Sequence, residues 1–239
     1  MHLIAFMTIL KYLQLPFYSD VFQMQHEVNQ LIEARWLPHF QTLHYQGGWS
    51  AIPLRSLGGK ADNIFIAPTN DIPYEDTVIL SSCQYFQKVL ENFKCQLKAV
   101  RLLKLNAGSV IKEHRDAELC FEKGEIRIHI PVIINDEVEF YLDNERMFLK
   151  EGECWYMNFN LPHSISNKGK NDRIHLVVDA IVNDWVKELF DQPGLNRKII
   201  QEPGYDDNTK RMMIARFREM NTVTSNRLAD EMEDSLRSV

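Results

Sequence analysis

A succession of short β-prone runs separated by turn residues extends from residue 100 to residue 182 and leaves few folds open. The runs are rich in Val, Ile, Phe and Tyr, and turn pairs such as Lys123-Gly124, Asp143-Asn144 and Glu151-Gly152 interrupt them. The runs expected to form strands are Val100–Leu105, Ile126–Ile134, Glu137–Leu142, Arg146–Leu149, Trp155–Phe159 and Ile174–Val182. The helical crossovers that parallel neighbours require are missing between them. The pattern therefore predicts an antiparallel jelly roll in a mainly β protein with flanking helices.

Helical periodicity precedes this β-rich segment. Apolar positions recur at helical spacing from Tyr18 to Arg35 and again from Ser81 to Phe93, each time with a serine near the start that can cap a helix. Glycines and prolines between residues 45 and 70 favour short strands and loops. The region before the β-rich segment is therefore expected to be a mixture of helices and loops.

The chain is expected to form one domain over residues 1–192 and a helical extension over residues 193–239. The domain contains the helical and loop region up to about residue 98 and the jelly-roll core over about residues 99–182. The extension has a methionine-rich apolar face that needs a partner surface. It therefore covers the barrel or joins two chains in a homodimer.

The charge balance restricts the partners of the protein. Thirty-three acidic residues against 27 basic ones give a formal net charge of -6, so no positive field gathers nucleic acid. The apolar run from Leu3 to Leu10 is too short to span a bilayer and lacks the basic start of a secretion signal. Four cysteines without a C-x-x-C pair favour buried thiols over a disulfide framework or a zinc site. The composition predicts a cytoplasmic protein without nucleic-acid or membrane partners.

Two short polar motifs carry the candidate chemistry. His114 and Asp116 follow the first strand and its turn, and residues i and i+2 of an extended chain point to the same side. One metal ion can then contact both side chains, and His163 supplies a third ligand if its strand lies beside theirs. Two imidazoles and one carboxylate form the facial triad of non-haem iron(II) oxygenases, which leaves positions open for co-substrate and oxygen. The plainer alternative is a buried histidine paired with an aspartate.

Two arginines alternate with histidines on apolar strands. Arg173 shares a strand face with His175, and Arg127 shares one with His129. An arginine that faces into a barrel needs an anionic partner, and its planar fork suits a carboxylate. We therefore expect a cavity that binds anions, with a dicarboxylate co-substrate at Arg173. The alternative for Arg173 is a strand-edge position in solvent.

A wider set of motifs accompanies these residues between about Leu13 and Val182. The motifs are Trp49-Ser50-x-Ile52-x-Leu54-Arg55, Asp76-Thr77, Val100-Arg101-Leu102-Leu103-Lys104-Leu105, Gly108-Ser109, His114-x-Asp116, Arg127-x-His129-x-Pro131, Gly152-Glu153-x-Trp155-Tyr156, Asn158, Pro162-His163, Asn167 and Asp172-Arg173-x-His175-Leu176-Val177. Together they resemble the aspartyl/asparaginyl β-hydroxylase family, including its small bacterial members such as the proline hydroxylases.

The resemblance implies an enzyme on a double-stranded β-helix, the cupin-like form of the jelly roll. Because the family consists of 2-oxoglutarate- and iron(II)-dependent dioxygenases, it implies hydroxylation of an unactivated C–H bond by O2, with release of succinate and CO2. The implied substrate is an amino acid, or an aspartyl or asparaginyl side chain in a peptide. By the same resemblance the Fe(II) ligands are His114, Asp116 and His163, Arg173 holds the distal carboxylate of 2-oxoglutarate, and His129 lies near its oxo-acid end.

The resemblance also indicates where the substrate binds. It makes Arg127 a clamp for a substrate carboxylate, with Trp49 and Arg55 as further contributors from the N-terminal region. Because Asp116 is expected to bind iron, it is not expected to supply the anion that Arg127 needs. The alternative is a structural ion pair between Arg127 and a nearby acid such as Glu122 or Glu125.

Two other classes of protein share the expected fold. A non-oxygenase cupin-type enzyme, such as an isomerase or epimerase, would use a different metal and consume no 2-oxoglutarate. A catalytically silent jelly roll would bind a ligand or a partner protein. The complete triad together with Arg173 argues against the silent form, because a binding module has no need for four matched polar groups.

Overall fold

A computed structural model provides the structure of the protein and describes residues 6–31, 36–66, 72–116, 119–201, 207–220 and 222–237. The chain divides into two compact units. The larger unit is Leu10–Arg197, and the smaller one combines Met1–Ile9 with Lys198–Val239. All the candidate site residues belong to the larger unit.

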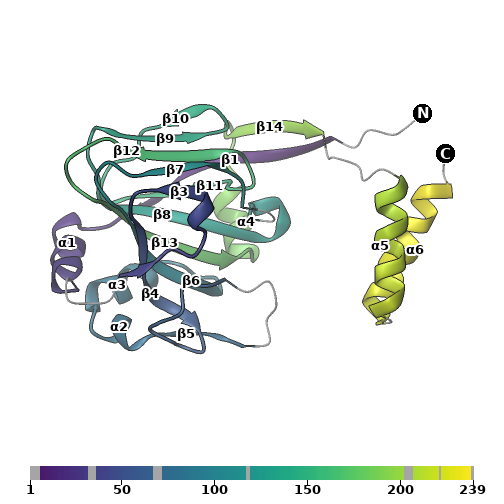
Figure 1. The fold of residues 1–239 in the computed structure, drawn as a ribbon, viewed down its shortest axis with the longest axis horizontal. Helices are drawn as coiled ribbons and strands as arrows, with labels where there is room; N and C mark the ends of the chain where they lie inside the picture. Colours follow the sequence, from purple (N-terminus) through teal and green to yellow (C-terminus); the bar gives the residue numbers. More distant parts are fainter. Residues whose placement is uncertain are drawn as a thin grey trace. The chain divides into compact units, whose positions relative to one another are not determined.

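Two antiparallel sheets form the larger unit (Figure 1). One has the strand order β1-β11-β8-β13-β6-β4-β2, with β5 paired to β4, and the other has the order β10-β9-β12-β7-β3. The strands are β1 (Phe6–Tyr18), β2 (Leu37–Pro38), β3 (Tyr45–Gln46), β4 (Trp49–Leu57), β5 (Tyr74–Asp76), β6 (Leu97–Leu105), β7 (Val110–His114), β8 (Glu125–Ile133), β9 (Val138–Leu142), β10 (Glu145–Met147), β11 (Glu153–Met157), β12 (His163–Asn167) and β13 (Arg173–Ile181).

Strands β6 to β13 are distributed over the two sheets as in a double-stranded β-helix. The larger sheet takes β6, β8, β11 and β13, and the smaller sheet takes β7, β9, β10 and β12. Each of the strands predicted between residues 100 and 182 overlaps one of these. The predicted jelly roll, in a mainly β protein with flanking helices, is therefore confirmed.

The two faces of the larger sheet differ because side chains alternate along each strand. On β8, Ile128 and Ile130 belong to the main hydrophobic core, whereas Arg127 and His129 line an internal cavity. Helices α1 (Val21–Gln30), α3 (Gln84–Leu90) and α4 (Asp184–Phe190) add Met24, Phe86 and Phe190 to the same core. Burial of each such side chain contributes about 1.5–3 kcal/mol. The helices thus stabilise one face of the sheet and leave the other for polar side chains.

The two predicted helices before the jelly roll are both present, but the second starts differently from the prediction. Helix α1 starts after Asp20, whose carboxylate accepts a hydrogen bond from the backbone N–H of Gln23 (3.1 Å), and it confirms the first prediction. α3 lies within the second predicted range and confirms that helix, but its N-cap is Cys83, and a separate short helix, α2 (Val78–Ser81), precedes it. Thr77 caps α2, so Ser81 ends a helix rather than starting one.

Strands β1, β7 and β12 lie outside the predicted runs. β1 buries Ile9, Leu13 and Leu15. The apolar run from Leu3 to Leu10 is interpreted only as too short to span a bilayer, so no strand is predicted there. Polar residues predominate in β7 and β12, and in His163-Ser164-Ile165-Ser166-Asn167 only Ile165 is apolar. Such strands escape a search for apolar runs, because only one of their faces is buried.

The smaller unit contains the beginning of β1, most of β14 (Asn196–Gln201) and the helices α5 (Asp207–Met220) and α6 (Val223–Arg237). β14 neighbours β1 in the sheet order. Arg218 of α5 pairs with Asp230 of α6 (Nη2 to Oδ1 2.6 Å). The extension predicted to be helical therefore begins with a strand. Among the residues described, none of the helices has both the length and the apolar character needed to cross a membrane.

Candidate active site

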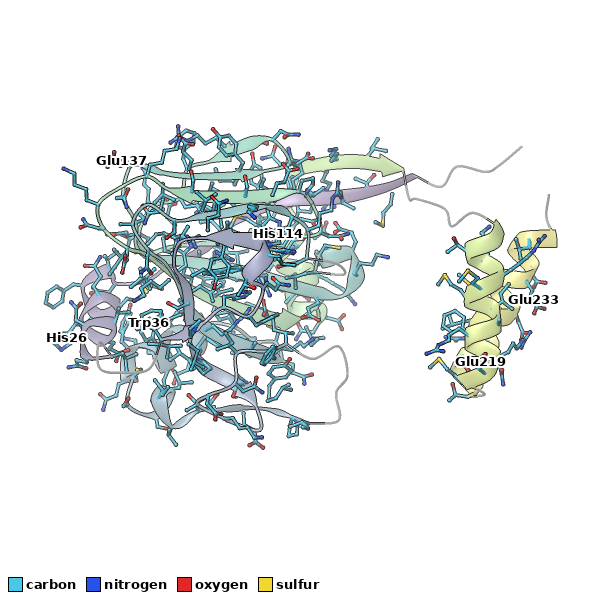
Figure 2. All side chains as sticks on the ribbon, in the orientation of Figure 1. His26, Trp36, His114, Glu137, Glu219 and Glu233 are labelled. Carbon is cyan, nitrogen blue, oxygen red and sulfur yellow. The ribbon has the colours of Figure 1, made fainter. Side chains whose placement is uncertain are left out.

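A cavity of about 640 Å³ lies inside the larger unit, a size typical of small-molecule sites. Figure 2 shows His114 among the strands of this unit. Both sheets contribute side chains to the wall, with Arg101, Arg127, His129 and Arg173 from the larger sheet and His114 and His163 from the smaller one. The jelly roll thus brings together basic and potentially metal-ligating residues that are far apart in the sequence.

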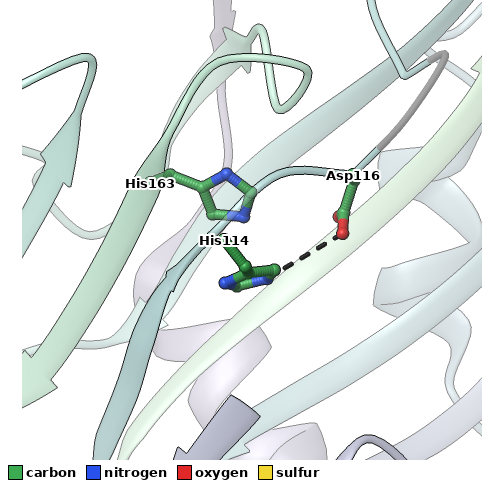
Figure 3. Close-up of side chains that lie close together, drawn as sticks. All are labelled: His114, Asp116 and His163. Atoms are coloured by element: carbon green, nitrogen blue, oxygen red, sulfur yellow. Dashed lines mark ion pairs between the residues drawn. The ribbon is translucent and has the colours of Figure 1, made fainter.

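His114, Asp116 and His163 converge at this cavity (Figure 3). His114 ends β7, and His163 begins β12 opposite it in the antiparallel pair. Asp116 lies just beyond β7, where its backbone N–H donates to the carbonyl of Phe159 (2.9 Å). One potential ligand atom from each of the three side chains lies within 4.8 Å of the others, and His114 Nε2 is 3.8 Å from Asp116 Oδ1. The structure therefore brings together the three residues predicted as a ligand set.

Hydrogen bonds to backbone carbonyls orient both imidazoles. His114 Nδ1 lies 2.8 Å from the Lys112 carbonyl oxygen, and His163 Nδ1 lies 3.0 Å from that of Leu161. A carbonyl only accepts hydrogen bonds, so each Nδ1 carries a proton, and in the neutral tautomer this leaves the lone pair on Nε2. Metal-binding histidines are commonly oriented in this way. The two rings therefore need no change of tautomer to bind a cation.

The charge states of the cluster suit a divalent metal. Burial lowers the pKa of His163 to about 4, so its imidazole is neutral near neutral pH. Burial acts to raise the pKa of Asp116, but the neighbouring Arg127 guanidinium and the two imidazoles outweigh it and hold the pKa below its ordinary value. Two neutral imidazoles and one carboxylate are the ligands of the non-haem iron(II) triad. The residues present therefore fit an iron(II) ion.

Arg173 is a buried cation in the cavity wall. It is 1% exposed, and no ion pair in the described part of the chain involves it. Its Nη2 donates to His175 Nδ1 (2.9 Å), and its Nε has no partner. Burial lowers the pKa of Arg173 to about 9. The alternative of a solvent-exposed position is therefore wrong, and a guanidinium in this state favours an anionic ligand.

His129 lines the cavity next to Arg173, and His175 lies behind them in contact with both. Burial holds the pKa of each histidine well below its ordinary value, so both rings are neutral. Because Arg173 only donates, His175 Nδ1 accepts, and His129 Nδ1, 3.3 Å away, must carry a proton to interact with the same nitrogen. His129 Nε2 is then a buried acceptor without a partner. This part of the wall offers an unsatisfied donor and an unsatisfied acceptor.

Arg127 has ion-pair partners that the sequence alone does not reveal. Its Nε and Nη2 donate to the two carboxylate oxygens of Asp179 (2.6 and 3.0 Å), and its Nη1 donates to Asp116 Oδ2 (2.5 Å). The alternative of a structural ion pair with a nearby acid is therefore present, but the acid is Asp179 rather than Glu122 or Glu125, which bond elsewhere. The expectation that Asp116, as an iron ligand, is not a partner for Arg127 is also wrong. A carboxylate has two oxygens, and only one of them contacts Arg127. Asp179 is the register partner of Arg127 between β13 and β8, a pairing that only the folded sheet creates.

Trp49 and Arg55, both expected near the substrate, lie in different places. Trp49 lines the cavity, where its ring stacks on His39 with the centroids 3.5 Å apart. Arg55 lies further along β4 and outside this cavity, where it pairs with Asp76 and donates to the Tyr74 carbonyl. The prediction for Arg55 is therefore wrong, because the pairing of β4 with β5 holds its guanidinium away from the site.

Residues of the site that the sequence reasoning missed are His39, Arg101 and Asp179. His39 and Arg101 line the cavity, and Asp179 is fully buried and accepts a hydrogen bond from Arg101 Nη2 (3.0 Å). Arg101 and Asp179 each place a charge within an apolar strand, which is a signal that the sequence contains. His39 has no comparable signal, because it lies outside any regular run.

The stability of the protein is expected to fall more in acid than that of a His39→Gln variant. Burial lowers the pKa of His39 to about 3, whereas a histidine in an unfolded chain titrates near pH ~6.5. As the pH falls below that value, the unfolded state takes up a proton that the folded state does not, which costs up to about 1.4 kcal/mol of folding free energy per pH unit. Urea unfolding at about pH 7 and about pH 4.5 should show a loss about 2 kcal/mol smaller in the variant. Equal losses would contradict a neutral, buried His39.

These features define a class of protein, a jelly roll whose cavity presents a facial set of two histidines and one aspartate beside an unpaired arginine. The model of the family described as Aspartyl/Asparaginyl beta-hydroxylase matches residues 19–182, more than half of the chain. The chain therefore belongs to the aspartyl/asparaginyl β-hydroxylase family, and the resemblance predicted from the motifs is confirmed.

Individual relatives show the range of similarity. The L-proline cis-4-hydroxylase of Rhizobium meliloti (strain 1021) is 25% identical over 160 residues, which cover 64% of this chain and 56% of the relative. The chain thus spans little more than half the length of this curated relative. The viral collagen prolyl hydroxylase of Paramecium Bursaria Chlorella virus-1 is 10% identical, with 72% of this chain and 96% of that chain covered and a TM-score of 0.43. A prolyl-4-hydroxylase of Pseudomonas putida is 10% identical, with 73% and 94% covered and a TM-score of 0.43.

Proposed function

We propose that the protein is a 2-oxoglutarate- and iron(II)-dependent dioxygenase. Its reaction would hydroxylate an unactivated C–H bond of an amino acid, or of an aspartyl or asparaginyl side chain in a peptide. The observation that carries the proposal is the convergence of two histidines and one aspartate, with ligand atoms within 4.8 Å of one another, in the same cavity as the unpaired Arg173. Family membership supports it, and so does a relative that is named as a proline hydroxylase.

The triad would hold the metal. His114 and His163 would supply their Nε2 atoms, and Asp116 would supply a carboxylate oxygen. Three protein ligands leave octahedral positions for the co-substrate and O2. The chemistry that iron supplies when bound is the activation of O2, coupled to conversion of 2-oxoglutarate to succinate and CO2. The protein's own residues hold both organic molecules in place and exclude water.

Arg173 would bind the distal carboxylate of 2-oxoglutarate. Its guanidinium carbon lies 6.0 Å from the centroid of the Phe140 ring, and its Nε lacks a partner. A carboxylate would accept the paired hydrogen bonds that this guanidinium can donate. His129, whose ring stacks on Phe159 (4.9 Å between centroids), would lie near the oxo-acid end. The aromatic rings keep water from these charged contacts, which strengthens them.

The charge of the cavity supports a substrate that carries a carboxylate. Among the described residues, the cationic side chains in the wall are Lys98, Arg101, Arg127 and Arg173, and the carboxylates in or beside it are Asp116, Glu125 and Asp179. A divalent metal and a dicarboxylate co-substrate cancel in charge, so one positive charge of these described residues remains to be balanced. Arg101 has a buried Nε without a partner. We therefore place the substrate carboxylate at Arg101 and Arg127, beside the ring of Trp49.

Anaerobic reconstitution with Fe(II) and 2-oxoglutarate, followed by exposure to O2, tests the proposal in a screen of L-proline, other free amino acids and Asp- or Asn-containing peptides. We expect succinate and hydroxylated product in equal amounts with at least one of them. The counterpart of that substrate with a carboxamide in place of its carboxylate should show a KM about tenfold higher or more. Iron binding without any consumption of 2-oxoglutarate would contradict the dioxygenase and favour a cupin-type isomerase or epimerase.

A further inference from the structure

We infer that Asp179, acting through Arg127, is a positioning residue for the carboxylate of Asp116. The inference rests on the metal site proposed above. Asp179 lies on β13, where it is 0% exposed, and it is the register partner of Arg127 on β8. Neither residue belongs to the candidate ligand set. The pair can therefore influence a bound metal in two ways, by orienting Asp116 or by the charge of Arg127.

Asp179 fixes the direction of the Arg127 guanidinium. Two hydrogen bonds, from Nε to Oδ1 (2.6 Å) and from Nη2 to Oδ2 (3.0 Å), join the two side chains edge to edge. This paired contact uses the planar fork of the guanidinium and prevents it from turning. The remaining nitrogen, Nη1, is then directed at Asp116 and donates to its Oδ2 at 2.5 Å. The three side chains form one connected relay.

The contact decides which oxygen of Asp116 is available to a metal. With Oδ2 bonded to Arg127, the other oxygen, Oδ1, lies 3.8 Å from His114 Nε2. Asp116 lies beyond the end of β7, so strand pairing does not fix its side chain. The hydrogen bond from Arg127 supplies the orientation that the backbone does not.

A purely structural ion pair explains less of this geometry. Asp179 has a second cationic partner, because Arg101 Nη2 lies 3.0 Å from its Oδ2. Neutralising Asp179 therefore does not require Arg127 to reach Asp116 as well. A guanidinium beside a metal site also repels a cation and weakens its binding by charge alone. Orienting the carboxylate would favour metal binding, whereas the charge of Arg127 opposes it.

Cobalt(II) titration of the purified protein tests the inference, with the visible absorption of bound Co(II) as the signal. Arg127→Met removes the guanidinium and keeps a long side chain. If Arg127 positions Asp116, the variant should bind Co(II) about 10–100-fold more weakly than the parent and show a changed absorption band. If Arg127 acts only through its charge, the variant should bind Co(II) more tightly. Equal or tighter binding by a folded variant would overturn the inference.

The Asp179→Asn variant tests whether the two residues act through one contact. It should also weaken Co(II) binding, and the double variant with Arg127→Met should bind no more weakly than Arg127→Met alone. Additive losses would overturn the relay, because Asp179 would then act independently. Lys187→Met is the control, since Lys187 pairs with Asp184 (2.9 Å) on α4 and does not line the cavity. It should leave Co(II) binding unchanged.

Circular dichroism and thermal unfolding establish which variants are folded. If Arg127→Met does not fold, Arg127→Lys decides, because a single ammonium keeps the charge but cannot bridge both carboxylates as the guanidinium does. Arg127→Lys should bind Co(II) several-fold more weakly, and an affinity equal to that of the parent would overturn the inference. A parent protein that binds no Co(II) would overturn the proposed metal site as well, whereas a binding parent with unaffected variants would overturn the inference alone.

Discussion

The His163→Ala variant is expected to lose iron(II) binding and turnover. His163 is one of only three side chains in the candidate ligand set. Replacing residues that merely support a metal ligand already costs about 10–100-fold in affinity, so loss of a ligand should weaken Fe(II) binding by at least roughly 100-fold. Succinate formation should then fall below detection. Anaerobic Fe(II) titration and the succinate assay measure the two effects separately.

The same variant should keep its fold. The ring of His163 hydrogen-bonds to the Leu161 carbonyl and packs edge-on against Phe159 (4.7 Å between centroids). Loss of these contacts should cost roughly 1–3 kcal/mol of unfolding free energy. The control is His26→Ala, because His26 is exposed on α1 and does not line the cavity (Figure 2). His26→Ala should alter neither activity nor iron binding, and unchanged turnover in His163→Ala would place the metal elsewhere.

Arg173→Lys is expected to weaken 2-oxoglutarate binding by about 2 kcal/mol, or roughly 30-fold. The lysine keeps the positive charge that the buried site holds, but its ammonium cannot make the paired hydrogen bonds of a guanidinium with a carboxylate. The hydrogen bond from Arg173 Nη2 to His175 is lost as well. Titration of 2-oxoglutarate into the Fe(II)-loaded protein without oxygen gives the dissociation constant from the metal-to-ligand absorption band.

The control for this measurement is Arg146→Lys. Arg146 is exposed on β10, where its guanidinium carbon lies 5.0 Å from the centroid of the Phe148 ring, and it does not line the cavity. The same change of chemistry there should leave the affinity for 2-oxoglutarate unchanged. If Arg173→Lys also binds 2-oxoglutarate with full affinity, the co-substrate must use another cation of the wall, such as Arg101.

Alternation along the strands made the basic wall of the cavity predictable. In β8 and β13 the sequence Arg-Ile-His occurs at Arg127-Ile128-His129 and at Arg173-Ile174-His175. The structure buries Ile128 and Ile174 in the main hydrophobic core and lines the cavity with Arg127, His129 and Arg173. The prediction succeeded because the side-chain period of an extended strand is two and does not depend on its neighbours.

Interactions across the sheet could not be predicted in the same way. Asp179 meets Arg127 because β13 pairs with β8 in one register, and a slip of one residue would move every side chain of the strand to the other face. Arg55 was misplaced for the same reason, since its position depends on the pairing of β4 with β5. Periodicity within one strand carries no information about the residue opposite.

Local spacing in the sequence was enough to establish the jelly roll and to select the candidate ligands and Arg173. Turn residues divide the strands, and the i, i+2 relation puts His114 and Asp116 on one side. The assembled sheets determine which charged side chains pair, namely Arg127 with Asp179 and Asp116, and Arg101 with Asp179. They also stack the ring of Trp49 on that of His39. The physical reason is that alternation and turns are properties of a single segment, whereas buried ion pairs and ring stacking require the order and register of segments distant in the chain.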